Sequence, residues 1–219
     1  MHAAWDATFS IVCRCRESGD LAVAVSTARL AVGSRVPFVL AGGAAVATQA
    51  RTNPALGYAA LAAVRSGLGA EEAMALALRG DEERESRQLS IIDAAGKSAV
   101  FTGREVLERS PWAGSMQGAD CAVAGNLLAG SAVPEAMAEA FEAREGFLGD
   151  RALAALEAGQ GAGGDKRGKV SAALLLARPG LEHPLLDLRV DHSADPVADL
   201  RRLYIAYLEA FPLPGPGAP

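Results

Sequence analysis

Two runs form the centre of the fold predicted for this chain: Thr8-Phe9-Ser10-Ile11-Val12-Cys13 and Leu21-Ala22-Val23-Ala24-Val25-Ser26. Both are rich in residues that favour strands, and the polar residues between them include Gly19, so they predict an antiparallel hairpin. In the second run both alternating faces are apolar, as expected of a sheet that is covered on both sides. The hairpin therefore belongs inside a layered core.

Further strands and helices are expected in blocks around this hairpin. The predicted strands lie at residues 44–50, 89–92, 99–101, 121–124, 170–177 and 187–190. The predicted helices lie at residues 54–66, 71–79, 133–143 and 148–158, with a closing helix from Asp195 and with Gly159 ending the fourth. Because strands and helices do not strictly alternate, a parallel doubly wound sheet is disfavoured. We predict one α+β domain of two packed antiparallel sheets with helices outside.

Composition excludes several classes of function. The chain has 219 residues, 50% of them hydrophobic, and a formal net charge of −5, which predicts a well-cored globular protein. An acidic chain without a Lys/Arg cluster argues against nucleic acid as a partner. The longest low-charge stretch, 36–50, is too short to span a bilayer, so we expect no membrane partner. Three cysteines and a charged N-terminal region favour the cytoplasm.

Two familiar motif types fail in this sequence. Gly159, Gly161 and Gly164 have the spacing of a dinucleotide-binding loop, but a predicted helix precedes them and a predicted strand follows, which is the reverse of what such a loop needs. The three histidines and three cysteines show neither a hydrolase triad setting nor paired metal-ligand spacing. We therefore expect no cofactor and no metal.

Several short motifs together resemble the bacterial family known as domain of unknown function 1028, over about residues 8 to 210. The opening hairpin also resembles that of the N-terminal-nucleophile (Ntn) hydrolases, the proteasome-like superfamily. Each motif is weak alone, and their order makes the resemblance specific. The motifs are Thr8 to Val12, Ala47-Thr48-Gln49-Ala50, Asn53-Pro54 with Gly57, Arg87-Gln88-Leu89, Phe101-Thr102-Gly103, Trp112-Ala113-Gly114, Gly125-Asn126-Leu127-Leu128, Ala162-Gly163-Gly164-Asp165 through Gly168, Asp187-Leu188-Arg189-Val190-Asp191 and Asp195-Pro196.

The resemblance implies a four-layer αββα sandwich in which Thr8 is the nucleophile and its own α-amine is the base. An α-amine titrates near 7.7 to 8.0, close to working pH, and so can accept the hydroxyl proton. The early lysine of proteasome subunits is missing, because the first lysine here is Lys97. Arg29 and Arg35 remain as sources of positive charge, although an arginine cannot act as a base.

The same resemblance implies roles for four further residues. Gly43, within Gly42-Gly43, would offer a backbone N–H to the oxyanion. Ser26 would orient the nucleophile, while Asn126 and Asp165 would hydrogen-bond its amine or hydroxyl. From the residues alone, each also fits a plain structural role, as a strand, bulge, turn or loop residue.

Residues 1–7 bear directly on this chemistry, because a threonine whose nitrogen carries a peptide bond has no basic amine. We expect either removal of this N-terminal extension or a misassigned start. A single domain is expected at 8–211, followed by a Pro/Gly-rich tail at 212–219.

Two functions remain open at this stage. The first is an Ntn amidohydrolase that cleaves a small-molecule amide or acylated amine through a threonyl ester. The alternative is a non-catalytic ligand-binding or assembly protein on the same fold. Self-association is open as well, since the superfamily often forms oligomers and the sequence carries no interface signature.

Overall fold

The computed structural model describes residues 8–213. The expected extension at residues 1–7 lies outside the described residues, as do residues 214–219 of the expected tail. Within the described part, the chain forms ten strands and six α-helices.

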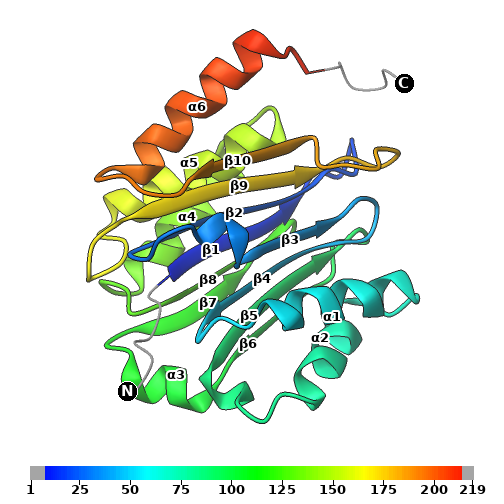
Figure 1. The fold of residues 1–219 in the computed structure, drawn as a ribbon, viewed down its shortest axis with the longest axis vertical. Helices are drawn as coiled ribbons and strands as arrows, with labels where there is room; N and C mark the ends of the chain where they lie inside the picture. The colour runs from blue at the N-terminus through cyan, green and yellow to red at the C-terminus, as the bar shows by residue number, and fades with distance from the viewer. Residues whose placement is uncertain (1–7, 214–219) are drawn as a thin grey trace.

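One sheet contains six antiparallel strands in the order β10-β9-β2-β1-β8-β7 (Figure 1). These strands are β1 (Thr8–Arg14), β2 (Leu21–Thr27), β7 (Ala113–Gln117), β8 (Cys121–Asn126), β9 (Ser171–Ala177) and β10 (Leu186–Val190). The predicted opening hairpin is confirmed, because β1 and β2 pair along their whole length from Thr8 opposite Thr27 to Arg14 opposite Leu21. The hairpin occupies the middle of the sheet, so both strands are covered.

The second sheet contains four antiparallel strands in the order β3-β4-β5-β6. They are β3 (Pro37–Leu40), β4 (Ala44–Ala50), β5 (Arg87–Asp93) and β6 (Ser98–Thr102). Helices α1 (Pro54–Arg65) and α2 (Ala70–Arg79) cover this sheet, as Figure 1 shows. Helix α1 begins as predicted, since the Asn53 side chain accepts a hydrogen bond from the Ala55 N–H at 3.1 Å and Pro54 follows it.

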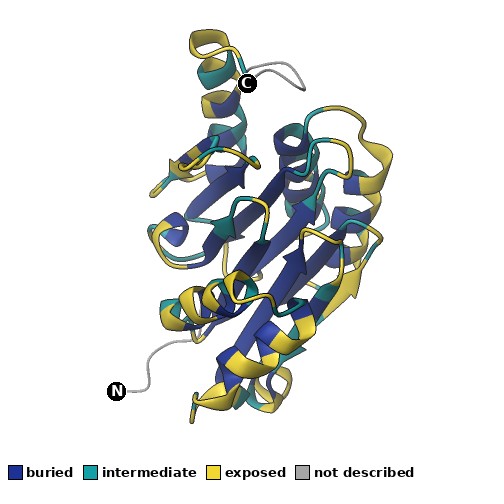
Figure 2. Ribbon diagram, turned by 90° about the vertical axis from the view of Figure 1, so that its right-hand side faces the viewer, coloured by how far each residue is buried: buried dark blue, intermediate teal, exposed yellow. Residues whose placement is uncertain are grey.

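The remaining helices are α3 (Arg104–Arg109), α4 (Ala132–Ala143), α5 (Leu148–Gly161) and α6 (Pro196–Ala210). Helices α4, α5 and α6 share an apolar core with the six-stranded sheet. A separate core of small aliphatic side chains, among them Val12, Val25 and Ala47, lies between the two sheets. Figure 2 shows the result, with buried strands inside and exposed faces on the outer helices. The predicted α+β class with two antiparallel sheets is confirmed.

Three elements were not predicted from the sequence, and one predicted helix end is wrong. Strand β7 and helix α3 were missed because both are short and largely exposed, so neither carries a clear apolar period. Strand β3 was missed inside an apolar stretch. Gly159 does not end α5: it lies within the helix, where a Cβ would come 2.6 Å from Met137 Cγ. Its role is therefore close packing of α5 on α4.

Candidate active site

Thr8 is the first residue of β1 and sits between two polar neighbours. It pairs with Thr27 on β2 and with Asn126 on β8, and its hydroxyl donates a hydrogen bond to Thr27 Oγ1 at 3.2 Å. Residues directly opposite one another in an antiparallel pair point to the same face of the sheet. Val12, on the same face of β1, belongs to the core between the sheets. The three polar side chains therefore face the four-stranded sheet.

A small cavity opens at Thr8. Its volume is about 20 Å³, roughly the space that one water molecule needs. It is lined by Thr8, Thr27, Arg29, Val32, Arg35, Val36 and Thr52. Although Thr8 is only 1% exposed, it reaches this cavity and is not enclosed entirely by packed side chains.

Asn126 connects Thr8 to a buried polar network between the sheets. Its Nδ2 donates to Gln88 Oε1 at 3.1 Å, and Gln49 Nε2 donates to the same oxygen at 2.7 Å. Ser10 Oγ donates in turn to Gln49 Oε1 at 2.7 Å. The Oδ1 of Asn126 is buried and has no hydrogen-bond partner among the described residues. An acceptor beside Thr8 is thus held in place by its own amide nitrogen.

Asp165 lies at the same end of the sheet and accepts hydrogen bonds from backbone N–H groups. Its Oδ2 accepts from the Ala28 N–H at 3.0 Å, and its Oδ1 accepts from the Arg167 N–H at 2.8 Å. Burial raises the pKa of this carboxyl above its ordinary value, and the hydrogen bonds from Arg167 and Ala28 oppose that effect. Since Ala28 directly follows Thr27, Asp165 fixes the end of β2 beside Thr8.

Ser26 does not lie beside the Thr8 side chain, contrary to the prediction. It pairs with Phe9, and Phe9 packs into the core under α4 and α5, so Ser26 faces the opposite side of the sheet. Its buried Oγ has no hydrogen-bond partner in the part of the chain that the structure describes. The hydroxyl next to Thr8 belongs to Thr27. Ser26 and Thr27 both carry a hydroxyl, so the sequence located the residue beside Thr8 only to within one position. A shift of one residue along a strand moves a side chain to the other face of the sheet.

Gly43 is also placed away from Thr8, so the expected oxyanion role for its N–H is corrected. That N–H donates to the Leu40 carbonyl at 2.9 Å in the turn before β4. The cavity residue Thr52 lies beyond the other end of β4, and seven strand residues span roughly 20 Å. The loop that reaches the cavity is therefore the one after β4, around Thr52.

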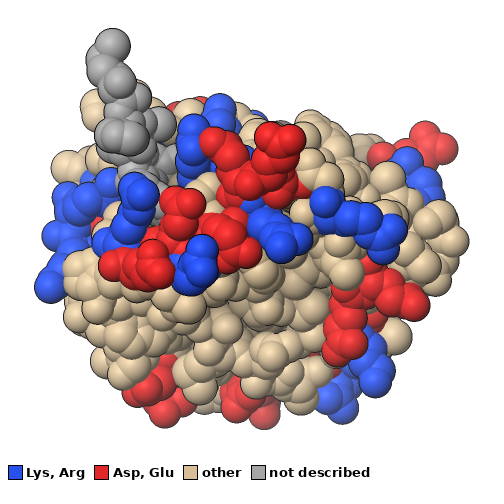
Figure 3. All heavy atoms as spheres, turned by 90° about the horizontal axis from the view of Figure 1, so that it is seen from below, with Lys and Arg blue, Asp and Glu red and all other residues tan. Residues whose placement is uncertain are grey.

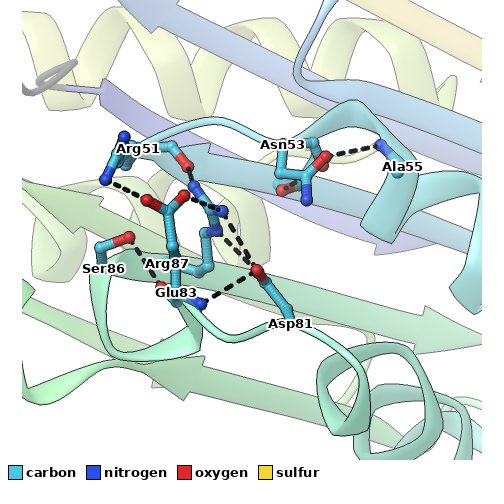
Figure 4. A network of polar contacts seen from close by, with 8 residues as sticks. Arg51, Asn53, Ala55, Asp81, Glu83, Ser86 and Arg87 are labelled. Carbon is cyan, nitrogen blue, oxygen red and sulfur yellow. Dashed lines mark hydrogen bonds and ion pairs between the residues drawn. The ribbon is translucent and has the colours of Figure 1, made fainter. Parts of the chain in front are cut away.

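A network of ion pairs anchors the loop after β4 (Figure 4). The Arg51 N–H donates to the Ser86 carbonyl at 3.1 Å, and Arg87 Nη1 donates to the Arg51 carbonyl at 2.6 Å. Arg87 itself is buried and is held by Asp81 at 2.7 Å and Glu83 at 2.8 Å. The hydrogen bond from Arg87 holds the pKa of Asp81 below its ordinary value.

This anchor sets the direction of one backbone donor. A trans peptide unit is planar, so its C=O and N–H point in opposite directions. With the Arg51 carbonyl on Arg87, the Thr52 N–H points away from Arg87. Ala50, which precedes Arg51, has a φ of 70°. A non-glycine residue keeps this conformation only when its surroundings impose it. The loop conformation is therefore held by the network.

Other features of the described residues bear on cofactors and charge. No group of three His, Cys, Asp or Glu side chains in this part of the chain is arranged to hold a metal ion. Burial raises the pKa of the Cys13 and Cys121 thiols, in the latter to about 11, so neither is a reactive thiolate near neutral pH. On the face seen in Figure 3, acidic and basic side chains are interspersed. None of the described helices has the length and apolar character to cross a bilayer.

One family model matches most of the chain, and two solved structures are similar to it. The model of the "Family of unknown function (DUF1028)" matches residues 8–200. The crystal structure of protein SPO2555 from Silicibacter pomeroyi, described with that same family, is 34% identical and has a TM-score of 0.84, covering 92% of this chain and 86% of that chain. Anbu, the ancestral beta-subunit from Yersinia bercovieri, has a TM-score of 0.44 and 10% identity, covering 94% of this chain and 98% of that chain. No curated protein matches the chain significantly.

Proposed function

The chain belongs to the family of unknown function DUF1028, and we propose that it is an N-terminal-nucleophile amidohydrolase whose nucleophile is Thr8. The architecture proposed with it is a four-layer αββα sandwich. In that arrangement α1 and α2 form the layer outside the four-stranded sheet, and α4 and α5 form the layer outside the six-stranded sheet. The substrate class is a small amide or acylated amine.

One observation carries the proposal. Thr8 stands at the start of a central strand, lines a cavity, and has the unpartnered Oδ1 of Asn126 opposite it in the sheet. A buried acceptor without a donor has a free energy cost of about 1–3 kcal/mol. An α-amine at Thr8 would supply the missing donor. Arg29 and Arg35 at the same cavity would lower the pKa of that amine, because like charge disfavours its protonated form.

The proposed reaction needs only Thr8 and water besides the amide. The Thr8 Oγ bonds to the amide carbon while its proton passes to the α-amine. When the C–N bond breaks, the α-ammonium returns that proton to the leaving amine, and a threonyl ester remains. Water then gives a proton to the α-amine and its oxygen bonds to the ester carbon. Thr8 Oγ leaves, takes back the proton, and the acid is released.

The oxyanion of each tetrahedral intermediate would be stabilised by the Thr52 N–H. Thr52 lines the cavity, and the hydrogen bond from Arg87 to the Arg51 carbonyl sets the direction of this N–H. A donor fixed before the reaction costs no reorganisation in the transition state, and one such donor contributes typically about 2.7–4 kcal/mol. Arg87 is then a positioning residue, not a catalytic one.

The chemistry requires a free nitrogen on Thr8, so the decisive experiment compares two forms of the chain. The first is the full chain, and the second begins at Thr8, which removes none of the described helices or strands. We expect amine release from a panel of small amides with the second form only. Thr8→Ala should lower this activity by at least about 10³-fold, and mass spectrometry should find the acyl group on Thr8. Full activity with residues 1–7 intact would contradict the proposal.

The alternative is a non-catalytic ligand-binding or assembly protein on the same fold. The small volume of the cavity, about 20 Å³, favours it, because a substrate must place its amide at the mouth. This alternative predicts that both forms of the chain lack hydrolysis and that Thr8→Ala changes no measured property except local packing.

A further inference from the structure

We propose that the Thr8 cavity takes a substrate that carries a carboxylate within a few bonds of the amide, and that Arg29 and Arg35 bind this carboxylate. The proposal depends on the proposed hydrolase for its reaction, whereas carboxylate binding is testable without turnover. It adds to the proposed function that the substrate is negatively charged.

The described residues that line the cavity carry a charge opposite in sign to that of the whole chain. Two of these seven residues are arginines, and none of the seven is acidic. Asp165, the carboxylate that fixes the end of β2 beside Thr8, already accepts hydrogen bonds from the Ala28 and Arg167 N–H groups and pairs with the Arg167 guanidinium. In a chain of formal net charge −5, this cavity is a local site for an anion.

Arg35 differs from most arginines of this protein. Arg14, Arg87 and Arg201, for example, each pair with an aspartate at 2.9 Å or less. Within the described residues, the Arg35 side chain makes no ion pair, and it is exposed to solvent at the mouth of the cavity. A guanidinium binds a carboxylate through two parallel hydrogen bonds. Because Arg35 makes no ion pair within the described residues, it need not break one to bind a carboxylate.

The segment that carries both arginines is held rigidly. The buried Ser171 Oγ donates to the Arg29 carbonyl at 2.6 Å and accepts from the Val32 N–H at 3.0 Å. The Thr48 N–H on β4 donates to the Val36 carbonyl at 3.1 Å. The segment is thus fastened to both sheets, and a site on rigid elements binds its ligand at a smaller entropic cost.

The same walls indicate the size of the group that enters. Val32 and Val36 are buried and apolar, and together with Thr52 they leave about 20 Å³ beside Thr8. Only the reacting carbonyl fits there, so the charged end of the substrate must lie at the mouth, where Arg35 is exposed. A compact acyl group or amine bearing a carboxylate within a few bonds of the amide meets both conditions.

Matched anilides test the acyl side, with succinyl (carboxylate), butyryl (neutral) and 4-aminobutyryl (ammonium) groups on the same leaving amine. Acetyl amides of β-alanine and of propylamine test the amine side. With the chain that begins at Thr8, we expect a carboxylate substrate to have kcat/KM at least about 10-fold above its neutral match, and the preference to weaken with added salt. Arg35→Gln should remove most of this preference through KM, whereas Arg65→Gln, which removes an equal charge from the end of α1, should not.

Binding supplies a readout that does not depend on turnover. Calorimetry with Thr8→Ala, in the full chain and in the chain that begins at Thr8, should detect succinyl anilide but not butyryl anilide, and Arg35→Gln should abolish the difference. Inorganic phosphate serves as the competing anion, and tighter binding of phosphate than of the carboxylate would overturn the proposal. Equal hydrolysis of neutral and carboxylate amides would overturn it while leaving the hydrolase intact. Carboxylate binding without any hydrolysis would support the anion site and contradict the hydrolase. If the chain shows neither carboxylate binding nor a preference for carboxylate substrates, the proposal is refuted.

Discussion

At the scale of single residues, Ser26 and Thr27 have similar side chains but different surroundings: Thr27 lies beside Thr8, and Ser26 does not. They are neighbours in sequence and face opposite sides of β2. Thr27 Oγ1 accepts the Thr8 hydroxyl at 3.2 Å, whereas the Ser26 Oγ is buried among apolar groups without a partner. Both residues are small and polar, so only their environment distinguishes them.

The pair Ser26→Ala and Thr27→Val gives a prediction from this difference. Ser26→Ala removes a buried unsatisfied hydroxyl, so we expect unchanged activity and a free energy of unfolding that stays equal or rises by up to about 1 kcal/mol. Thr27→Val keeps the shape and removes the hydrogen bond to Thr8, and we expect kcat/KM for amides to fall about 10-fold or more. Urea unfolding and amide kinetics check the two changes. A larger loss of activity in Ser26→Ala than in Thr27→Val would reverse the assignment of the faces.

At the scale of elements, the loop after β4 depends on residues that follow α2. Arg87 and Ser86 hold the two polar groups of Arg51, and Asp81 and Glu83 hold Arg87. The buried ion pair between Arg87 and Asp81 is weak evidence of stability by itself, because desolvation offsets the attraction. The effect of the ion pairs here is on geometry, since they impose the direction of the Thr52 N–H.

Asp81 makes this coupling measurable through pH. Its pKa in the folded chain is lowered, mainly by the hydrogen bond from Arg87, and the ordinary value for an aspartate is about 3.9. A lowered folded pKa means that the stabilisation is complete above about pH 5 and is lost as the pH falls through the folded pKa. We expect Asp81→Asn to lower the free energy of unfolding by about 1–2 kcal/mol at pH 7, and the difference from the unsubstituted chain to shrink below pH 4.

The control for Asp81→Asn is Glu82→Gln, which removes an exposed charge from the adjacent position. Urea unfolding at pH 7, 5, 4 and 3 should show no comparable pH-dependent difference for Glu82→Gln. In amide kinetics, Asp81→Asn should lower kcat more than it raises KM, because a loosened Thr52 N–H stabilises the transition state less than before. An unchanged kcat with lowered stability would limit Arg87 to a structural role.

At the scale of the whole molecule, the layer between the two sheets is divided into an apolar part and a polar part. Val12, Val25 and Ala47 belong to the apolar part. The polar part is the chain of buried hydrogen bonds that joins Ser10, Gln49, Gln88 and Asn126 across four strands of both sheets. This network holds the sheets in register at the end where Thr8 lies.

Gln88→Met is the sharpest test of the network. It keeps the length of the side chain and leaves Gln49 Nε2 and Asn126 Nδ2 without their acceptor, so we expect a loss of about 1–3 kcal/mol in the free energy of unfolding with an unchanged denaturant slope. Ser90→Ala on the same strand is the control, because the buried Ser90 Oγ has no hydrogen-bond partner, and it should cost much less. Equal costs for the two variants would mean that the network adds no stability.

Much of the fold could be predicted from the sequence, because most helices and strands depend on neighbours along the chain. The two strand-favouring runs on either side of Gly19 predicted a hairpin, and the capping pair Asn53-Pro54 predicted the start of a helix; the structure contains both. The family resemblance placed Thr8 and Asn126 in one site, and the structure pairs them on adjacent strands.

Tertiary structure alone decided which residues surround Thr8. Strand register places Ser26 on the face away from Thr8. The packing of one sheet on the other brings Thr52 to the cavity and leaves Gly43 in the turn at the other end of β4. Local propensity carries no information about these contacts, because they join residues that are far apart in the chain and a shift of one residue reverses a face. Local sequence patterns determined most of the helices and strands, and long-range pairing determined which groups meet around Thr8.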